Sequence, residues 1–295
     1  MTDIGLNHIA GQWVEGGGGT IAVTDPATGE VVAQQALADA ADVDRAVAAA
    51  RACHDSGVLT DMRPLDRGRL VQRMADVFRA NADEIATLLT REQGKPLWEA
   101  RGEVENAAKY FEYFGNQAST VEGKSIPLGA GYLDFTLMEP YGVSAQIIPW
   151  NFPLLMAAWK LGPALATGNC VILKPAEQTP LTALRLGEIL QEAGVPDGVV
   201  NIVPGMGETA GAALAAHDDV DKVAFTGSTE VGKMIVNTAA GNLKKVTLEL
   251  GGKSPNIIFK DTADLEATIA GAASAIFFNH GQCCCAGSRL YVEKD

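Results

Sequence analysis

The sequence lacks any uncharged apolar run that approaches the roughly 18 residues needed for a membrane-spanning helix. Its first residues, MTDIGLNHIAGQW, have neither a basic region nor an apolar core, so we expect no signal peptide. Basic side chains are also in short supply, because 23 Lys and Arg face 36 Asp and Glu, giving a net charge of −13. Such a field repels phosphate backbones and anionic lipid, so we expect no nucleic-acid partner and no membrane partner.

Cysteine is scarce as well, with five residues, three of them adjacent and none in CxxC spacing. This pattern argues against a disulfide framework and against a zinc ribbon. Adjacent thiols cannot converge tetrahedrally on an ion without other ligands, so we also expect no metal site. The chain is 47% hydrophobic and 20% charged, which is typical of a globular protein. We therefore expect a cytoplasmic globular protein.

The first part of the chain indicates short strands followed by helices. The segment WVEGGGGTIAV, followed by turn residues, predicts a hairpin. Helical spacing then places four sets of apolar residues on inward faces. These sets are Val43, Ala46, Val47 and Ala50; Leu70, Met74, Val77 and Phe78; Ile85, Leu88 and Leu89; and Val104, Ala108 and Phe111. Residues 120–140 have turn signals and alternating apolar residues, which predict a hairpin that projects from the body.

After Tyr141 the sequence alternates regularly between strand and helix patterns. The predicted strands are 143–148, 170–174, 199–203, 222–225 and 246–250. The predicted helices are 153–166, one with Thr179 as its N-cap and Pro180 in its first position, 209–216 and 230–240. This alternation predicts an α/β fold with a doubly wound parallel sheet, which binds ligands at the carboxyl ends of its strands.

Polar and glycine residues follow each predicted strand. FTGSTEVG (225–232) has a tight glycine turn at the start of a helix, where Gly227, Ser228 and Gly232 suit a dinucleotide pyrophosphate. The pattern is not GxGxxG, so an ordinary strand-to-helix turn stays possible. Lys174 and Glu177 end a neighbouring strand, where a carboxylate accepts hydrogen bonds from ribose hydroxyls, although either residue alone also fits a solvated surface charge.

Two further segments suit catalysis. Glu249 ends a strand beside two glycines, where a partly buried carboxylate with a raised pKa activates water; a simple pair with Lys253 is the alternative. A helix with a buried face comes next and is broken at 279–281. That face comprises Leu265, Ile269, Ala272, Ala273 and Ile276. The three cysteines follow in a glycine-flanked loop, where a thiol is a candidate nucleophile and His280 is a candidate base or a solvated side chain.

Five motifs in this order closely resemble the aldehyde dehydrogenase superfamily. They are PWNFPLLMAAWKLGPALATGN, KPAEQTP, FTGSTEVGK, LELGGKSPN and FFNHGQCCCAGSR. The similarity extends over essentially the whole chain, including DPATGEVV near the start and EPYGVSAQIIPWNFP in the middle. The resemblance implies a Rossmann-like cofactor domain, a catalytic domain of which this chain holds the beginning, and NAD as the cofactor.

The resemblance also assigns roles by position. Cys284 matches the family nucleophile, Glu249 the general base and Asn151 the amide that stabilises the oxyanion. Cys283 and Cys285 match variable neighbours. The positions that match cofactor contacts are Ile148, Trp150, Lys174, Glu177, Gly227, Ser228, Gly232 and Leu250. Because relatives that acylate coenzyme A lack the glutamate, Glu249 favours hydrolysis to a carboxylic acid.

The resemblance implies four regions. We expect a helical part of the cofactor domain at 1–119, an oligomerisation hairpin at 120–140, an NAD-binding core at 141–251 and the start of the catalytic domain at 252–295. Family members continue beyond the equivalent of Asp295, into the ExFGP motif and a strand used in oligomerisation. We therefore expect the N-terminal part of a longer chain that forms a homo-oligomer.

The expected reaction is NAD-dependent oxidation of an aldehyde to a carboxylic acid through a cysteine thiohemiacetal and thioester. The alternative is a truncated, catalytically incompetent fragment with only nucleotide-binding or structural function. Glu177 favours NAD over NADP, because its carboxylate repels a 2′-phosphate. Phe152, Leu155, Met156 and Trp159 suggest an apolar lining for an aliphatic or aromatic aldehyde, or simply the core of a helix.

Overall fold

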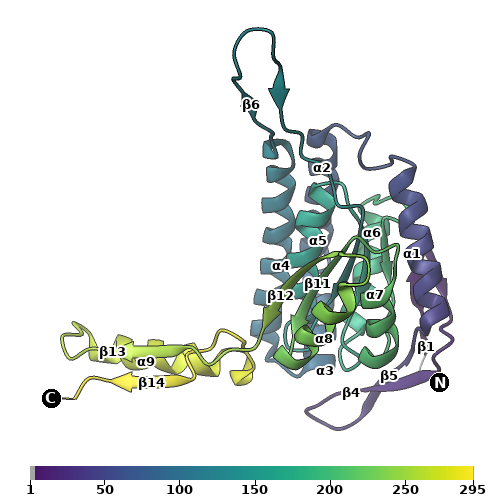
Figure 1. Cartoon of the computed structure of the whole chain (residues 1–295). Coiled ribbons are helices and arrows are strands. Elements are labelled where there is room, and N and C mark those ends of the chain that lie inside the picture. Colours follow the sequence, from purple (N-terminus) through teal and green to yellow (C-terminus); the bar gives the residue numbers. More distant parts are fainter. Residues whose placement is uncertain (1–3, 295) are drawn as a thin grey trace.

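The computed structural model describes residues 4–294, in which a central seven-stranded sheet organises the fold (Figure 1). Its strand order is β12-β11-β8-β9-β10-β2-β3. The five parallel strands are β8 (Val143–Ile147), β9 (Cys170–Lys174), β10 (Val200–Ile202), β11 (Lys222–Gly227) and β12 (Lys245–Leu250). The predicted doubly wound parallel sheet is therefore confirmed, with two antiparallel strands added at its edge, β2 (Asn7–Ile9) and β3 (Gln12–Val14).

Helices cover both faces of this sheet, which explains why every residue of β8 and β9 is buried. The helices that share contacts on one face are α1 (Ala40–Asp55), α7 (Ala212–Ala216) and α8 (Thr229–Ala239). Those on the other face are α5 (Pro153–Ala166) and α6 (Leu181–Glu192), with α2 (Pro64–Ala80), α3 (Ala82–Gln93) and α4 (Leu97–Gln117) packed outside them. Nearly all the apolar side chains expected to face inward on α1 to α4 are buried; Val77 and Leu88 are half-buried.

The predicted hairpin forms around the turn residues 25–30 and not across the glycine run at 16–19. β3 pairs with β2 in the central sheet, whereas β4 (Thr20–Thr24) pairs with β5 (Val31–Ala36) in a separate sheet that also holds β1 (Ile4–Gly5). A Cβ atom at Gly16 would lie 2.1 Å from the carbonyl oxygen of Leu37. The glycines are therefore needed for close backbone approach rather than for a turn.

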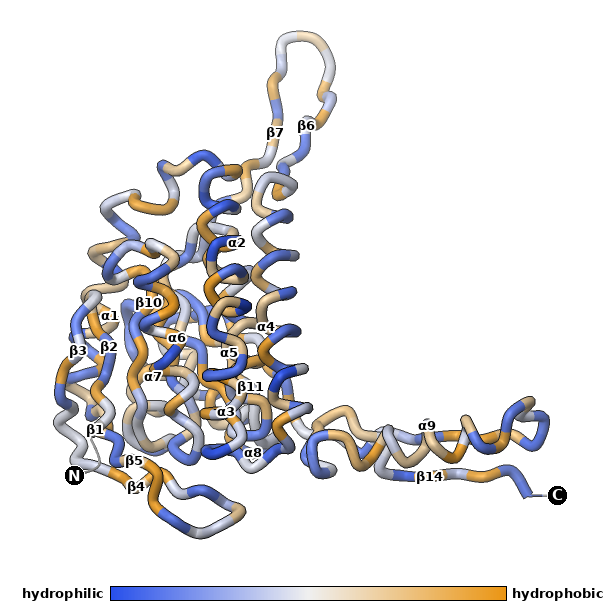
Figure 2. The backbone as a smooth tube through the Cα atoms, turned by 180° about the vertical axis from the view of Figure 1, so that it is seen from behind, coloured by the Kyte–Doolittle hydropathy of each residue, from blue (hydrophilic) through white to orange (hydrophobic). Residues whose placement is uncertain are grey.

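Two segments project from this body. The hairpin of β6 (Ser125–Ile126) and β7 (Asp134–Phe135) extends beyond the ends of α2 and α4, as expected (Figure 1). The other segment contains β13 (Pro255–Ile258), α9 (Leu265–Phe277) and β14 (Arg289–Val292), with β13 and β14 parallel. Figure 2 shows this second segment standing apart from the body, with α9 largely hydrophobic.

The expected buried face of α9 is wrong for this chain. No residue of α9 is buried, and the side chains of Leu265 and Ile269 are 61% and 53% exposed. The reason is that two strands and one helix leave the apolar side of α9 without a covering layer among the residues described. No helix in the same residues is both long and apolar enough to cross a membrane.

Helix α6 begins at Leu181, and its N-terminal cap is not Thr179 as expected. The carboxylate of Glu92, at the end of α3, accepts hydrogen bonds from the N–H groups of Leu181 (2.7 Å) and Thr182 (3.0 Å) and from the Thr182 hydroxyl. A residue 89 positions earlier therefore satisfies the free N–H groups of the helix. Burial raises the pKa of Glu92 to about 7, although these hydrogen bonds lower it.

Glu92 should make stability depend on pH. Between the ordinary pKa of 4.5 and about 7, folded Glu92 holds a proton that the unfolded chain has released, so stability is lost as pH rises through this range. The loss should reach on the order of 3 kcal/mol. We expect Glu92→Gln to flatten the decline of Tm between these pH values, as measured by thermal denaturation. Parallel curves for the two proteins would contradict this prediction.

Candidate active site

A cavity of about 1250 Å³ lies at the carboxyl ends of the parallel strands, where the sequence predicted the site. Ten of the eleven predicted site residues line it. They are Ile148, Trp150, Asn151, Lys174, Glu177, Gly227, Ser228, Glu249, Leu250 and Cys284. The apolar residues suggested as a lining, Phe152, Leu155, Met156 and Trp159, also face this cavity. The fold thus brings together residues separated by more than 130 positions.

Strand register explains why these residues meet. Ile147 at the end of β8 pairs with Lys174 at the end of β9 and with Phe225 in β11. Two residues further along, Gly227 pairs with Leu250 at the end of β12. Parallel strands in this register end at one edge, so the loops that follow them surround a common space.

Lys174 and Glu177 form an ion pair at this edge, with 3.2 Å between Nζ and Oε2. The side chain of Lys174 is 3% exposed and that of Glu177 is 25% exposed. Burial lowers the pKa of Lys174, although Glu177 raises it. Burial acts to raise the pKa of Glu177, but Lys174 and several hydrogen bonds outweigh it, so this pKa lies below its ordinary value. The pair therefore presents a carboxylate to the cavity at neutral pH.

The turn between β11 and α8 has the geometry of an anion site. Ser228 is the N-cap of α8, and its Oγ accepts a hydrogen bond from the Val231 N–H at 3.2 Å. That bond uses an acceptor position of Oγ, so the hydroxyl proton remains available to a ligand. Both Gly227 and Ser228 line the cavity, next to the positive end of the α8 dipole.

Gly232 is the one predicted site residue that does not line the cavity. It is buried in α8, and a Cβ atom there would lie 2.8 Å from Cδ2 of Leu250. Its small size lets α8 pack closely against β12. The structure therefore gives Gly232 a packing role behind the predicted phosphate-binding turn.

Glu249 lines the cavity but is exposed, so the expected partial burial is wrong for this chain. The segment that follows β12, with β13, α9 and β14, projects away from the body (Figure 1). The alternative pair with Lys253 does not form among the described residues, where the Lys253 ammonium donates instead to the Gly252 carbonyl at 3.2 Å. Burial lowers the pKa of Lys160, a residue that the sequence patterns did not single out, to about 8, while the charge of Glu249 raises it.

The side chain of Asn151 points to the cysteine loop. Its Nδ2 donates a hydrogen bond to the backbone carbonyl of Gln282 at 2.6 Å. An amide has two N–H groups, so the second one stays free to bind an oxygen in the cavity. Asn151 is thus held against the cysteine loop two residues before Cys284, and both residues line the cavity.

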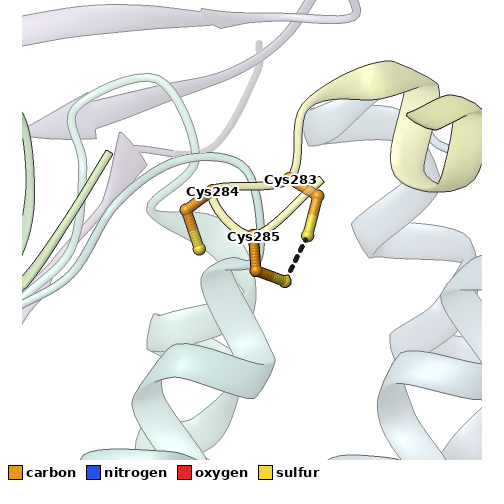
Figure 3. A group of neighbouring side chains, drawn as sticks. All are labelled: Cys283, Cys284 and Cys285. Carbon is orange, nitrogen blue, oxygen red and sulfur yellow. Dashed lines mark hydrogen bonds between the residues drawn. The ribbon is translucent and has the colours of Figure 1, made fainter. Parts of the chain in front are cut away.

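The three thiols gather on one side of their loop (Figure 3). Their sulfur atoms all lie within 4.8 Å of one another, and Cys283 Sγ is 3.3 Å from Cys285 Sγ. A tetrahedral ion needs a fourth ligand, so the proximity of three sulfur atoms leaves the expectation of no metal site as a prediction. Burial raises the pKa of Cys283 to about 11, which keeps this thiol protonated at neutral pH. His280 has a positive φ of 58°, is exposed and does not line the cavity, so it is a poor candidate for the base.

The model of the aldehyde dehydrogenase family matches residues 13–295. The chain belongs to the aldehyde dehydrogenase family. It is 53% identical to the human mitochondrial aldehyde dehydrogenase over 281 residues, which are 94% of this chain and 54% of that protein. It is 51% identical to human retinal dehydrogenase 2 over 297 residues, 99% of this chain and 57% of that protein.

Solved aldehyde dehydrogenase structures share the fold. The structure of an NAD⁺ complex of the Bacillus cereus aldehyde dehydrogenase superposes with a TM-score of 0.97 at 46% identity. The match covers 99% of this chain and 60% of that one. The chain therefore spans between half and three fifths of the length of the aldehyde dehydrogenases that it matches.

We expect the turn at Gly227 to require glycine. A Cβ atom there would lie 2.4 Å from Cζ of the buried Phe225 ring, whereas one at Gly251, on the same edge, would meet open space. Gly227→Ala should therefore lower stability by about 1–3 kcal/mol, and Gly251→Ala should change it little. Chemical denaturation of both variants measures the difference, and equal effects would show that the ring does not restrict this position.

Proposed function

We propose that the protein containing this chain oxidises an aldehyde to a carboxylic acid with NAD, through a thioester on Cys284. The observation that supports this most is the single cavity that holds a thiol, an amide beside it, a carboxylate and a phosphate-binding turn. Aldehyde dehydrogenase relatives whose structures contain NAD⁺ have this fold, and their identity to this chain makes a common reaction the simplest reading.

The cavity residues fit a dinucleotide. The Ser228 hydroxyl and the first N–H groups of α8 would hold the pyrophosphate, and Glu177 would accept hydrogen bonds from the adenosine ribose. Ile148, Trp150 and Leu250 supply apolar surface along the same groove. Bound there, NAD would accept a hydride from the substrate carbon.

The chemistry at the other end of the cavity begins with the Cys284 thiolate. Its sulfur attacks the aldehyde carbon, and the carbonyl oxygen becomes an oxyanion that the free N–H of Asn151 and the backbone N–H of Cys284 stabilise. Loss of hydride leaves a thioester. Glu249 then takes a proton from water, the resulting hydroxide attacks the acyl carbon, and the C–S bond breaks to release the acid.

The exposed position of Glu249 and the uncovered side of α9 bear on the alternative, a fragment with binding or structural function only. We propose that the further length present in the matched relatives has its counterpart in the whole protein and covers both. On this proposal the 295 residues bind NAD, while the whole protein is needed for turnover. Turnover by these residues alone would refute that division.

The proposal also includes the oligomeric state of the protein and the compartment in which it acts. The β6–β7 hairpin exposes many large apolar residues, including Tyr132 at 74% and Leu133 at 85%, which supports its role in a homo-oligomer. The five cysteines are all free thiols, which supports a reducing compartment such as the cytoplasm. We also propose that the chain consists of the four regions that the resemblance implies, at 1–119, 120–140, 141–251 and 252–295.

Substitutions of the three adjacent cysteines in the whole protein should differ in their effect on activity. Cys284→Ser should reduce aldehyde-dependent NADH formation by roughly a thousandfold or more and leave NAD binding intact, because it removes the nucleophile. Cys283→Ala and Cys285→Ala are the matched controls and should keep rates within about tenfold of the original. If a folded Cys283→Ala or Cys285→Ala protein were as inactive as Cys284→Ser, the nucleophile would be misassigned.

Glu177 should select the cofactor. We expect kcat/KM to be higher with NAD than with NADP, because a 2′-phosphate would approach the ionised carboxylate. Glu177→Gln should lower the ratio of kcat/KM with NAD to kcat/KM with NADP by about tenfold. Glu188 is an exposed glutamate on α6, and Glu188→Gln should leave the ratio unchanged. A higher kcat/KM with NADP in the unmodified protein would refute the assignment.

A further inference from the structure

The amide of Asn151 is supported from behind by a buried lysine. The side chain of Lys95 is 1% exposed and pairs with Glu103, whose side chain is 3% exposed. Its Nζ also donates a hydrogen bond to the backbone carbonyl of Asn151 at 3.2 Å and lies 4.5 Å from the centre of the Phe152 ring. A buried ion pair contributes little net stability, so stability alone does not explain why Lys95 and Glu103 are buried beside the site.

A second donor reaches the same carbonyl from the cysteine segment. The side-chain nitrogen of Asn279 donates to the Asn151 carbonyl at 2.9 Å. Asn279 is 1% exposed and has a positive φ of 51°, and its own N–H donates to a carboxylate oxygen of Glu99 at 3.3 Å. The unusual backbone shape after α9 is therefore fixed by contacts with α4 and with Asn151.

A third contact holds Gln282, the residue before Cys283, against the turn between α3 and α4. Gln93 Nε2 donates to the side-chain oxygen of Gln282 at 2.9 Å, while the Gln93 oxygen accepts from the backbone N–H of Lys95 at 3.1 Å. The backbone carbonyl of Gln282 in turn accepts from the Asn151 amide. These hydrogen bonds form a closed circuit from the α3–α4 turn to the cysteine loop and back to Asn151.

We propose that Lys95 is a positioning residue for the reaction. With Asn279, its ammonium fixes the Asn151 backbone, and the Asn151 amide in turn holds the Gln282 carbonyl of the cysteine loop, so that the second N–H of Asn151 and the Cys284 sulfur keep a constant distance. This inference rests on the proposed function, because the oxyanion is what that relation serves. Lys95 acts through Asn151 and does not contact the reacting atoms.

The test is a double-mutant cycle in the whole protein. Lys95→Met should lower kcat by about 10–100-fold with little change in the KM for NAD, since small displacements of catalytic groups have effects of this size. In an Asn151→Ala background the same change should cost less than about twofold, because there is no amide left to position. An equal loss in both backgrounds would refute the proposal.

Two companion variants keep the test decisive. Lys95→Met leaves Glu103 buried without its partner, so Lys95→Met/Glu103→Gln supplies a neutral version if the single variant does not fold. Arg101→Met is the matched control: Arg101 lies on the same helix as Glu103 in an exposed ion pair with Asp83, and its loss should leave kcat unchanged. A loss of kcat in this control equal to that of Lys95→Met would contradict a specific role for Lys95.

Hydrogen exchange gives a readout that does not depend on activity. Amide exchange in the peptide that spans residues 278–286 should be faster in Lys95→Met/Glu103→Gln than in the original protein, and unchanged in Arg101→Met. Unchanged exchange in the double variant would refute the positioning role even if no aldehyde proved to be a substrate. Failure of the original protein to reduce NAD, with exchange altered as expected, would instead count against the proposed function.

Discussion

The shared register of the parallel strands is the constraint on which the cavity depends. Because β8, β9, β11 and β12 end at one edge, Lys174, Gly227 and Glu249 reach the same space from segments far apart in sequence. Glycine at 227 and 232 allows the turn and the α8 helix to lie close to that edge. A one-residue slip of any strand would turn its side chains to the other face and remove part of the cavity wall.

Patterns that reflect local structure could be read from the sequence. Apolar runs predicted the five parallel strands because both faces of the sheet are covered, and helical spacing predicted the buried faces of α1 to α4. The ten site residues that line the cavity were reached by adding the resemblance to this pattern. Strand and helix patterns alone placed Lys174, Glu177, Glu249 and the turn at Gly227 at the ends of strands, but left each of these with an ordinary structural alternative.

The wrong expectations all depend on contacts between distant segments. The N-terminal cap of α6 comes from Glu92, on a different helix, and the glycine run at 16–19 is needed because the backbone at Leu37 lies close to it. No local sequence pattern reveals either contact. Glu249 and α9 are exposed because no layer among the described residues packs over them. The periodicity of a sequence shows which face of a helix is apolar, but not whether another segment covers that face. The circuit through Gln93 and Lys95 was missed for the same reason, since its partners lie more than 50 residues away.

Acylation of Cys284 is the most direct test of the proposed reaction. The whole protein carrying Glu249→Gln should be mixed with an aldehyde and NAD, quenched in acid and digested, and the peptide that contains residues 283–285 examined by mass spectrometry. We expect the acyl group of the aldehyde to accumulate on Cys284, because the thioester forms while its hydrolysis lacks a base. An acyl group on Cys283 or Cys285, or NADH formation with no acyl group on any of the three, would contradict it.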